Sequence, residues 1–167
     1  MIIGLAGKAG SGKDTVGDWM VEQAGFEKVS FAEPIYAALA AMGFPAPATR
    51  EEKEAKIKGF DFSWRQAAQT LGTEWGRGLD KHLWLKIVES KLRSSNPIVV
   101  TDVRFENEAL MIRKLGGYII HIHGRGSFLG ERALHTSENG LEVYPEDWTI
   151  ENSGTLGELY ETLSEIF

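Results

Sequence analysis

The sequence contains no cysteine, which excludes disulfide bonds and thiolate metal sites. It also lacks an excess of positive charge. The formal net charge is −6, whereas a broad electrostatic grip on duplex nucleic acid requires a basic face. We therefore expect no nucleic-acid partner, while a local basic pocket for a small anion remains compatible with this charge. Since the absence of cysteine also fits a reducing compartment, we expect a cytoplasmic protein.

Long hydrophobic runs are absent as well. The longest uncharged stretch, Pro34–Thr49, is interrupted by Gly43, Pro45 and Pro47 and is too short to span a bilayer. The first residues show neither the basic region nor the cleavage site of a signal peptide, so we expect no membrane association. A chain of 167 residues, 43% of them hydrophobic, suits a single domain over residues 1–167 with a proper core.

Apolar strand-like runs alternate with helical patterns along the chain. Strands are expected at Ile2–Ala6, Lys28–Phe31, Ile98–Thr101, Tyr118–His123 and Trp148–Glu151, and helices at Asp14–Ala24, Pro34–Met42, Trp64–Trp75, Lys81–Leu92, Glu106–Leu115 and Thr155–Ile166. The stretch 44–62 reads as irregular or as a helical hairpin. This alternation predicts an α/β fold with a parallel sheet of about five strands and helices on both faces. Ligands then bind beyond the carboxyl ends of the strands.

A glycine-rich loop follows the first expected strand. Gly7-x-x-x-x-Gly12-Lys13 has the spacing of a P-loop and lies between a strand and a helix, as that motif requires. Loop N–H groups and the helix N-terminus hold phosphates, and Lys13 reaches the β- and γ-phosphates. The alternative is a plain turn with a solvent-exposed lysine, and a Rossmann site fits the glycine spacing less well. The motif predicts the three-layer fold of P-loop NTPases and ATP binding by Gly7, Lys8, Ala9, Gly10, Ser11, Gly12, Lys13, Asp14 and Thr15.

Two carboxylates are candidate Mg²⁺ ligands. Asp14 occupies the position where Ser or Thr normally gives its hydroxyl to the metal. It would hold magnesium directly or through water, cap the helix, or do both. Asp102 follows the strand at Ile98–Thr101, as a Walker-B aspartate does, although it could also serve only as a helix cap. Arg104 is expected to face the same crevice, where it would stabilise the transferring phosphoryl group.

Five segments together resemble bacteriophage-type deoxynucleoside monophosphate kinases, members of the P-loop nucleoside monophosphate kinase group. They are "GLAGKAGSGKDTVGDW", "SFAEPI", "RQAAQTLGTEWGR", "TDVRFENEA" and "HTSE", and residues 44–62 carry none of the likeness. In this family "GKDT" is the usual form of the loop, whereas Glu33 stands where Asp is more common. The resemblance implies Mg²⁺-dependent transfer of the γ-phosphoryl group of ATP to a deoxynucleoside 5′-monophosphate (dNMP), in a phage-infected host's cytoplasm. Related kinases are often homodimers.

Such a kinase needs an acceptor pocket opposite the ATP site, expected in a helical part over about 33–95. Arg65 and Arg77 suit the acceptor phosphate, because the planar fork of arginine makes paired hydrogen bonds. Gln69 lies one helical turn from Arg65 and is suited to read a base edge. Aromatic residues would stack on the base or simply pack in the core. The expected substrate-binding residues are Phe31, Arg65, Gln69, Trp75, Arg77, Trp84, Arg104 and Glu106.

A lid is expected at about 124–138, where Arg125 and Arg132 would cover the transferring phosphoryl group; the alternative is a solvated loop. His121 and His123 share one face of a strand, without a third candidate metal ligand. Near the carboxyl terminus, Asn152, Gly154 and Thr155 are expected against the adenine of ATP, or else in a plain strand-to-helix turn.

The expected mechanism is in-line phosphoryl transfer without a covalent intermediate. Lys13, magnesium and the arginines at 104, 125 and 132 would stabilise charge, and positioning would supply the rest. One rival is a P-loop kinase of another small acceptor, such as dephospho-coenzyme A. A rival of another class is a nucleotide-gated switch that makes no product.

Overall fold

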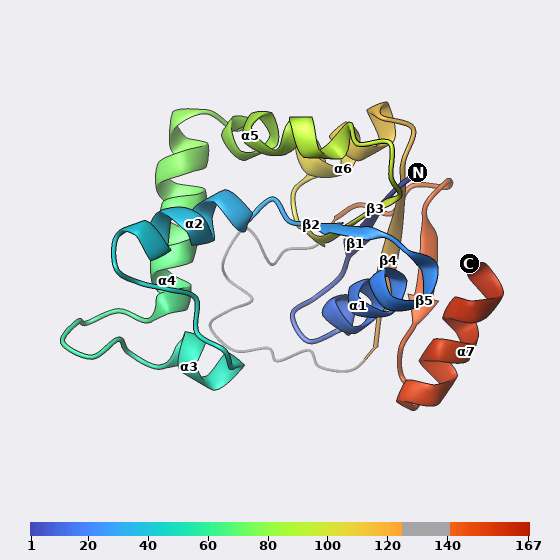
Figure 1. Cartoon of the computed structure of the whole chain (residues 1–167), viewed down its shortest axis with the longest axis horizontal. Helices are drawn as coiled ribbons and strands as arrows, with labels where there is room; N and C mark the ends of the chain where they lie inside the picture. Colours follow the sequence, from blue (N-terminus) through green and yellow to red (C-terminus); the bar gives the residue numbers. More distant parts are fainter. Residues whose placement is uncertain (125–140) are drawn as a thin grey trace. The chain divides into compact units, whose positions relative to one another are not determined.

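The computed structural model describes residues 1–124 and 141–167 (Figure 1). These residues form two compact units: Met1–Ser30 together with Ser90–Phe167, and Phe31–Glu89. The first contains a β-sheet and the second is helical. The chain passes between them twice, after Ser30 and after Glu89, and the second passage falls within the helix α5 (Leu83–Leu92). Among the described residues, no helix is long and apolar enough to cross a bilayer.

The first unit is built on a five-stranded sheet with the order β2-β3-β1-β4-β5. Its strands are β1 (Ile2–Ala6), β2 (Glu27–Val29), β3 (Ile98–Val103), β4 (Tyr118–His123) and β5 (Trp148–Glu151). Every neighbouring pair is parallel, and the central strand β1 pairs with β3 and β4. The carboxyl ends of all strands therefore meet at one edge, where the glycine loop follows β1.

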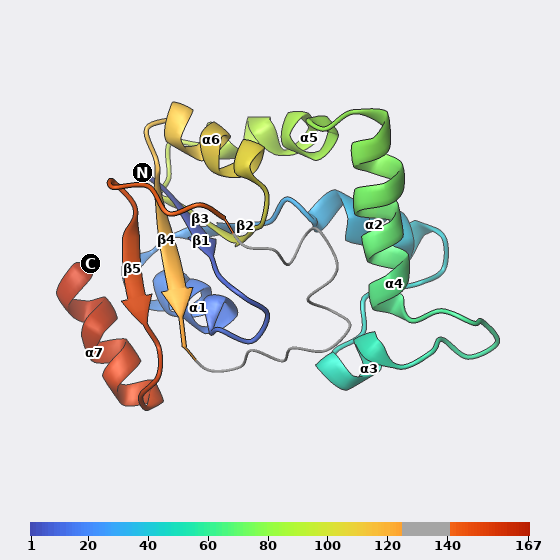
Figure 2. The same ribbon diagram turned by 180° about the vertical axis from the view of Figure 1, so that it is seen from behind.

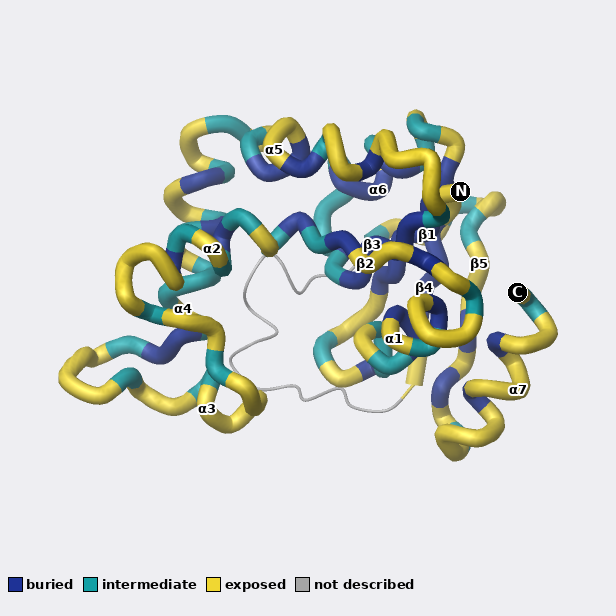
Figure 3. Tube along the Cα trace, viewed as in Figure 1, coloured by how far each residue is buried: buried dark blue, intermediate teal, exposed yellow. Residues whose placement is uncertain are grey.

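Helices cover both faces of this sheet (Figures 1 and 2). On one face, α1 (Lys13–Ala24) and α7 (Leu156–Ile166) pack into a core that includes Val16, Met20 and Leu163. On the other face, α6 (Glu106–Lys114) places Ile112 against Gly4 of β1 and Ile119 of β4 lies beside it. The inner strands β1, β3 and β4 are the most continuously buried part of this unit, whereas β2 and β5 are largely exposed (Figure 3). The sequence prediction of a parallel α/β sandwich is confirmed.

The second unit has its own small core. It contains α2 (Glu33–Ala41), α3 (Arg50–Glu54), α4 (Trp64–Gln69), a π-helix η1 (Thr70–Arg77) and most of α5. The core side chains come from three helices: Ile35 and Leu39 of α2, Trp64 of α4 and Trp84 of α5. Residues 44–62, predicted to be irregular or a helical hairpin, contain only the five-residue helix α3, which begins with a capping box between Thr49 and Glu52.

Several expected element boundaries need correction. The strand expected at Lys28–Phe31 lies at Glu27–Val29, and the helix expected at Lys81–Leu92 begins at Leu83. The helix expected at Trp64–Trp75 continues to Arg77, and its second half is a π-helix rather than an α-helix. The strand expected at Ile98–Thr101 extends to Val103, so Asp102 lies within β3 and not after it. The register between β1 and β3 shifts between Gly4 and Ala6, which lengthens the β3 side of the pair beside the glycine loop.

Candidate functional site

The glycine loop has the geometry of a phosphate cradle. It connects the end of β1 to the first residue of α1, Lys13. Gly7 has φ +146°, and a Cβ there would lie 2.5 Å from the carbonyl oxygen of Ile122, so only glycine fits this position. The Lys13 ammonium donates to the carbonyl oxygens of Gly7 (2.7 Å) and Lys8 (2.8 Å). These contacts hold the positive charge over the loop.

Ser11 and Asp14 occupy different environments in this region. Ser11 is 1% exposed, and its hydroxyl has no hydrogen-bond partner among the described residues. Such a group is costly to bury without a partner, so this hydroxyl is suited to bind a ligand oxygen at the loop. Asp14 lies exposed in the first turn of α1, where its charge also favours the helix dipole.

Asp102 is partly buried near the carboxyl end of β3, the strand beside β1. Its Oδ2 accepts a hydrogen bond at 2.7 Å from the hydroxyl of Ser30, the residue that directly follows β2. Among the described residues, no cluster of three or more His, Cys, Asp or Glu side chains could hold a metal. The described strand ends of the first unit thus offer single carboxylates for a metal, and not a cluster of protein ligands.

The turn from β3 into α6 is fixed by a buried glutamate. Glu108 is 4% exposed, and its Oε2 accepts from the backbone N–H groups of Arg104 (2.8 Å) and Phe105 (3.0 Å). These bonds satisfy orphan donors at the start of the helix. The backbone of Arg104, the expected catalytic arginine, is therefore held beside the start of α6.

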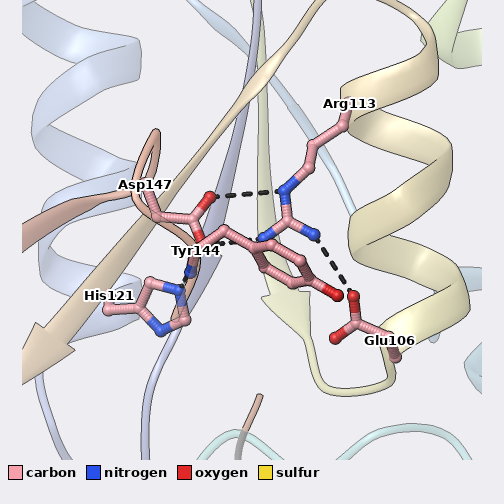
Figure 4. Close-up of polar contacts among 5 residues, drawn as sticks. All are labelled: Glu106, Arg113, His121, Tyr144 and Asp147. Carbon is pink, nitrogen blue, oxygen red and sulfur yellow. Dashed lines mark hydrogen bonds and ion pairs between the residues drawn. The ribbon is translucent and has the colours of Figure 1, made fainter. Parts of the chain in front are cut away.

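A polar network joins α6, β4 and the segment before β5 (Figure 4). At its centre, the Asp147 side chain is 2% exposed and accepts from Arg113 Nη2 at 2.7 Å and Nε at 3.3 Å. His121 Nε2 lies 3.0 Å from the same carboxylate. Arg113 also reaches Glu106 at 3.3 Å and stacks on the ring of Tyr144, 4.1 Å from its centroid.

The network shifts the pKa values of its members in a consistent way. Burial acts to raise the pKa of Asp147, but the Tyr144 N–H, Arg113 and His121 together lower it below the ordinary carboxyl value. Burial acts to lower the pKa of Arg113, but the hydrogen bond and charge of Asp147 raise it. A hydrogen bond to Glu106 is the main cause of a raised pKa for Tyr144. Asp147 and Arg113 are therefore held as an ion pair.

The network includes two residues for which the sequence suggested other roles, Glu106 and His121. Glu106, expected to bind substrate, shares its carboxylate with Arg113. His121 and His123 do share a strand face, and their rings stack with centroids 6.4 Å apart. His121, however, is buried beside Asp147, which the sequence analysis did not single out.

In the second unit, the structure places Arg65 and Gln69 on α4, one turn apart as expected. Arg65 Nε lies 3.8 Å from Glu54 Oε1 of α3, and both side chains are mostly buried. Arg77 is the last residue of η1. A π-helix advances by less than the roughly 100° per residue of an α-helix, because its hydrogen bonds span five residues. The angle between Arg65 and Arg77 around the helix is therefore not the one that α-helical periodicity predicts.

The three aromatic candidates differ in exposure. Trp84 is 6% exposed, belongs to the core of the second unit, and donates from Nε1 to the carbonyl oxygen of Gly72 at 2.7 Å. Phe31 is 3% exposed, whereas Trp75 is 54% exposed. Burial favours the core-packing alternative for Trp84 and Phe31, and leaves Trp75 as the candidate for stacking on a base.

The three residues expected against adenine follow β5. Thr155 caps α7 in a capping box with Glu158, and Gly154 packs against the Glu158 side chain. Asn152 is 9% exposed, and its side-chain amide donates to the Ser11 carbonyl oxygen at 2.9 Å. The structure thus joins Asn152 to the phosphate loop. The expected lid arginines, Arg125 and Arg132, lie outside the described residues.

Residues that the sequence analysis missed act mainly as partners of the expected ones. They are Ser30, Glu54, Glu108, Arg113, Tyr144 and Asp147. Only Glu108 had a local signal, since a glutamate at the third helical position often closes a capping box. That signal was weak because the preceding cap residue is Phe105.

Comparisons with known proteins identify the family and the fold of this chain. The sequence profile of the deoxynucleotide monophosphate kinase family matches residues 42–163. This match runs through 44–62, where the sequence analysis found no likeness, and begins after the glycine loop. A putative deoxynucleotide monophosphate kinase of Acanthamoeba polyphaga mimivirus is 31% identical over 98% of this chain and 94% of its own length.

Two phage proteins are also similar. The deoxynucleoside-5′-monophosphate kinase of Escherichia phage T5 is 29% identical over 70% of this chain and 49% of its own length. The deoxynucleotide monophosphate kinase of Escherichia phage RB69 is 30% identical over 66% of this chain and 48% of its own length. The aligned parts thus span about half of each phage protein.

Solved kinase structures share the fold. Shikimate kinase from Aquifex aeolicus vf5 superposes with a TM-score of 0.57 at 16% identity, over 99% of this chain and 95% of that chain. A gluconokinase from Sinorhizobium meliloti 1021 superposes with a TM-score of 0.54 at 17% identity, over 98% of this chain and 91% of that chain. The fold is therefore that of the P-loop kinases. Together with the family profile and the mimivirus relative, it shows that the chain belongs to the deoxynucleotide monophosphate kinase family and is a kinase.

Proposed function

We propose that this protein transfers the γ-phosphoryl group of ATP to a deoxynucleoside 5′-monophosphate, giving ADP and the deoxynucleoside diphosphate. The observation that carries the proposal is the phosphate cradle at residues 7–13, with Lys13 held over the loop at the carboxyl edge of the sheet. Family membership supports the acceptor class, since the family and its viral relatives are named for deoxynucleotide monophosphates.

The residues of the first unit fit Mg²⁺ as the companion of ATP. Magnesium is usually bound by one or two carboxylates together with substrate phosphates and water, and not by a cage of protein ligands. Asp14 and Asp102, on the elements that follow and flank β1, are the carboxylates that would hold it. When bound, the ion neutralises charge on the β- and γ-phosphates.

The chain's own groups supply the remaining steps in this proposal. Loop N–H groups and the α1 N-terminus bind the phosphates, and Lys13 leaves its loop carbonyls to contact them. The acceptor phosphate meets Arg65 and Arg77 of the second unit, and Trp75 stacks on the base. Arg104, with the expected lid residues Arg125 and Arg132, stabilises the charge of the transferring phosphoryl group. Positioning then allows direct in-line attack by the acceptor oxygen.

Replacing Lys13 tests the central assignment. We expect Lys13→Met to lower kcat by at least a hundredfold, because the lysine charge on the transferring phosphoryl group is lost. The matched control is Lys114→Met, an exposed position at the end of α6 in the same unit. ADP release is measured with a coupled assay, and circular dichroism checks the fold. Near-normal turnover of the Lys13→Met protein would contradict the proposal.

A panel of acceptors tests the substrate class. The four deoxynucleoside monophosphates, their ribose counterparts and dephospho-coenzyme A are each offered with Mg·ATP, and the phosphorylated products are separated by ion-exchange chromatography. We expect turnover with at least one deoxynucleoside monophosphate. Activity only on dephospho-coenzyme A would show that the acceptor is not a deoxynucleoside monophosphate. Tight ATP binding without any transfer would indicate a nucleotide switch.

A further inference from the structure

Asn152 contacts two separate segments at the carboxyl edge of the sheet. It follows β5 directly, and its backbone N–H donates to the His123 carbonyl oxygen at the end of β4, at 2.7 Å. Its side-chain amide donates to the Ser11 carbonyl oxygen at 2.9 Å in a buried hydrogen bond. One residue thus ties the phosphate loop to the rigid ends of β4 and β5.

The surroundings of Asn152 leave it little freedom. A side chain on Gly12 would overlap the Asn152 amide nitrogen, and a Cβ on Gly124 would lie 2.5 Å from its carbonyl oxygen. Both glycines have φ +103°, which other residues rarely adopt. The close approach of the amide to the loop is therefore built into three segments of the chain.

The bond to Ser11 has a consequence for the phosphate site. The peptide between Ser11 and Gly12 is planar and trans, since the described residues contain no cis peptide bond. In a trans peptide the C=O and the following N–H point in opposite directions. Holding the Ser11 carbonyl toward Asn152 therefore aims the Gly12 N–H to the other side of the loop. That N–H belongs to the set that a P-loop turns toward phosphate oxygens.

We infer that Asn152 is a positioning residue for the phosphate loop, which fixes the Ser11–Gly12 peptide for binding the phosphates of ATP. This inference rests on the proposed function and changes the expected role of Asn152 from adenine contact to phosphate-loop support. An aspartate at this position would present a carboxylate oxygen, which cannot donate, to the Ser11 carbonyl oxygen. The role therefore requires the amide N–H of asparagine and not only its shape.

The test compares two ligands that share phosphates but differ in the base. Isothermal titration calorimetry measures Kd for ATP and for inorganic tripolyphosphate, both with Mg²⁺, on the whole chain. We expect Asn152→Ala to raise the Kd of both ligands by about the same factor, roughly tenfold, because one hydrogen bond is lost. Asn152→Asp, which keeps the side-chain shape, is expected to weaken both at least as much. The KM for ATP rises while the KM for the dNMP acceptor stays unchanged.

Asn96→Ala is the matched control, because the Asn96 amide donates to the exposed Glu27 and lies away from the loop. It is expected to leave both affinities unchanged. Weaker ATP binding with unchanged tripolyphosphate binding would overturn the inference in favour of adenine contact. A lower melting temperature with both affinities unchanged would overturn it in favour of a purely structural role. If the wild-type protein binds neither ligand, the proposed function falls, and the inference with it.

Discussion

At the residue scale, Asp147 is the shared partner of Arg113, His121 and the Tyr144 backbone (Figure 4). Its side chain is 2% exposed, so the carboxylate depends on these partners and not on water for its stabilisation. A buried charge left without its partner is strongly destabilising. Asp147 therefore joins the segment before β5 to α6 and β4 through charge as well as through packing.

The change Asp147→Asn removes this charge with little change of shape. We expect it to lower the free energy of unfolding at pH 7 by about 3 kcal/mol, because Arg113 keeps its charge but loses its nearest counterion and retains, of the described carboxylates, only Glu106, at 3.3 Å. The control is Asp18→Asn, whose partner Lys28 is equally close at 2.7 Å but whose pair is solvent-exposed. We expect that control to cost about 1 kcal/mol or less. Urea unfolding followed by circular dichroism gives both values.

The same pair predicts a pH dependence. The pKa of Asp147 is lowered in the folded protein, so the folded chain takes up its proton less readily than the unfolded chain. Its stabilising contribution is complete above the unfolded carboxyl pKa of about 4, and is lost as pH falls through the lower folded pKa. The stability gap between wild type and Asp147→Asn should therefore narrow below about pH 4. A gap that stays constant from pH 7 to pH 3 would show that charge is not its cause.

At the element scale, the π-helix η1 is bound to α5 by one tryptophan. Trp84 donates to the Gly72 carbonyl oxygen, and its ring lies where a side chain on Gly76 would stand. Local sequence does not specify this arrangement, since the partner of η1 comes from another element. This is why the sequence predicted the helix but not its π-helical half.

Two glycines near the end of this helix give a matched comparison. Gly76→Ala would overlap the Trp84 ring, and we expect a loss of about 1–3 kcal/mol from overpacking. Gly78 has helical φ −67° and ψ −33°, and a Cβ there meets nothing within 4 Å. Gly78→Ala should therefore be neutral or stabilising by up to about 1 kcal/mol. Equal losses of unfolding free energy for the two variants would contradict the packing described for Trp84.

At the scale of the whole molecule, features built from consecutive residues could be predicted from the sequence, whereas contacts between distant residues could not. β1, β4 and β5 begin and end where their apolar runs predict, and the glycine loop is recognisable because its residues are consecutive. Asp147, Arg113 and His121 meet only after folding, so no spacing in the sequence indicates their network. The link from Asn152 to Ser11 spans 141 positions, and its partner is a backbone carbonyl, which leaves no mark on residue type.

Binding of Mg·ATP at the glycine loop should stabilise the folded chain. At a hundred times its Kd, a ligand adds about 2.7 kcal/mol to the stability of the folded state. For a chain of this size we expect Mg·ATP to raise Tm by roughly 5–10 °C. At the same ATP concentration, chelating Mg²⁺ with EDTA should reduce the shift, and Lys13→Met should nearly abolish it. Differential scanning fluorimetry measures all three conditions. A full shift in the Lys13→Met protein would place the nucleotide somewhere other than the glycine loop.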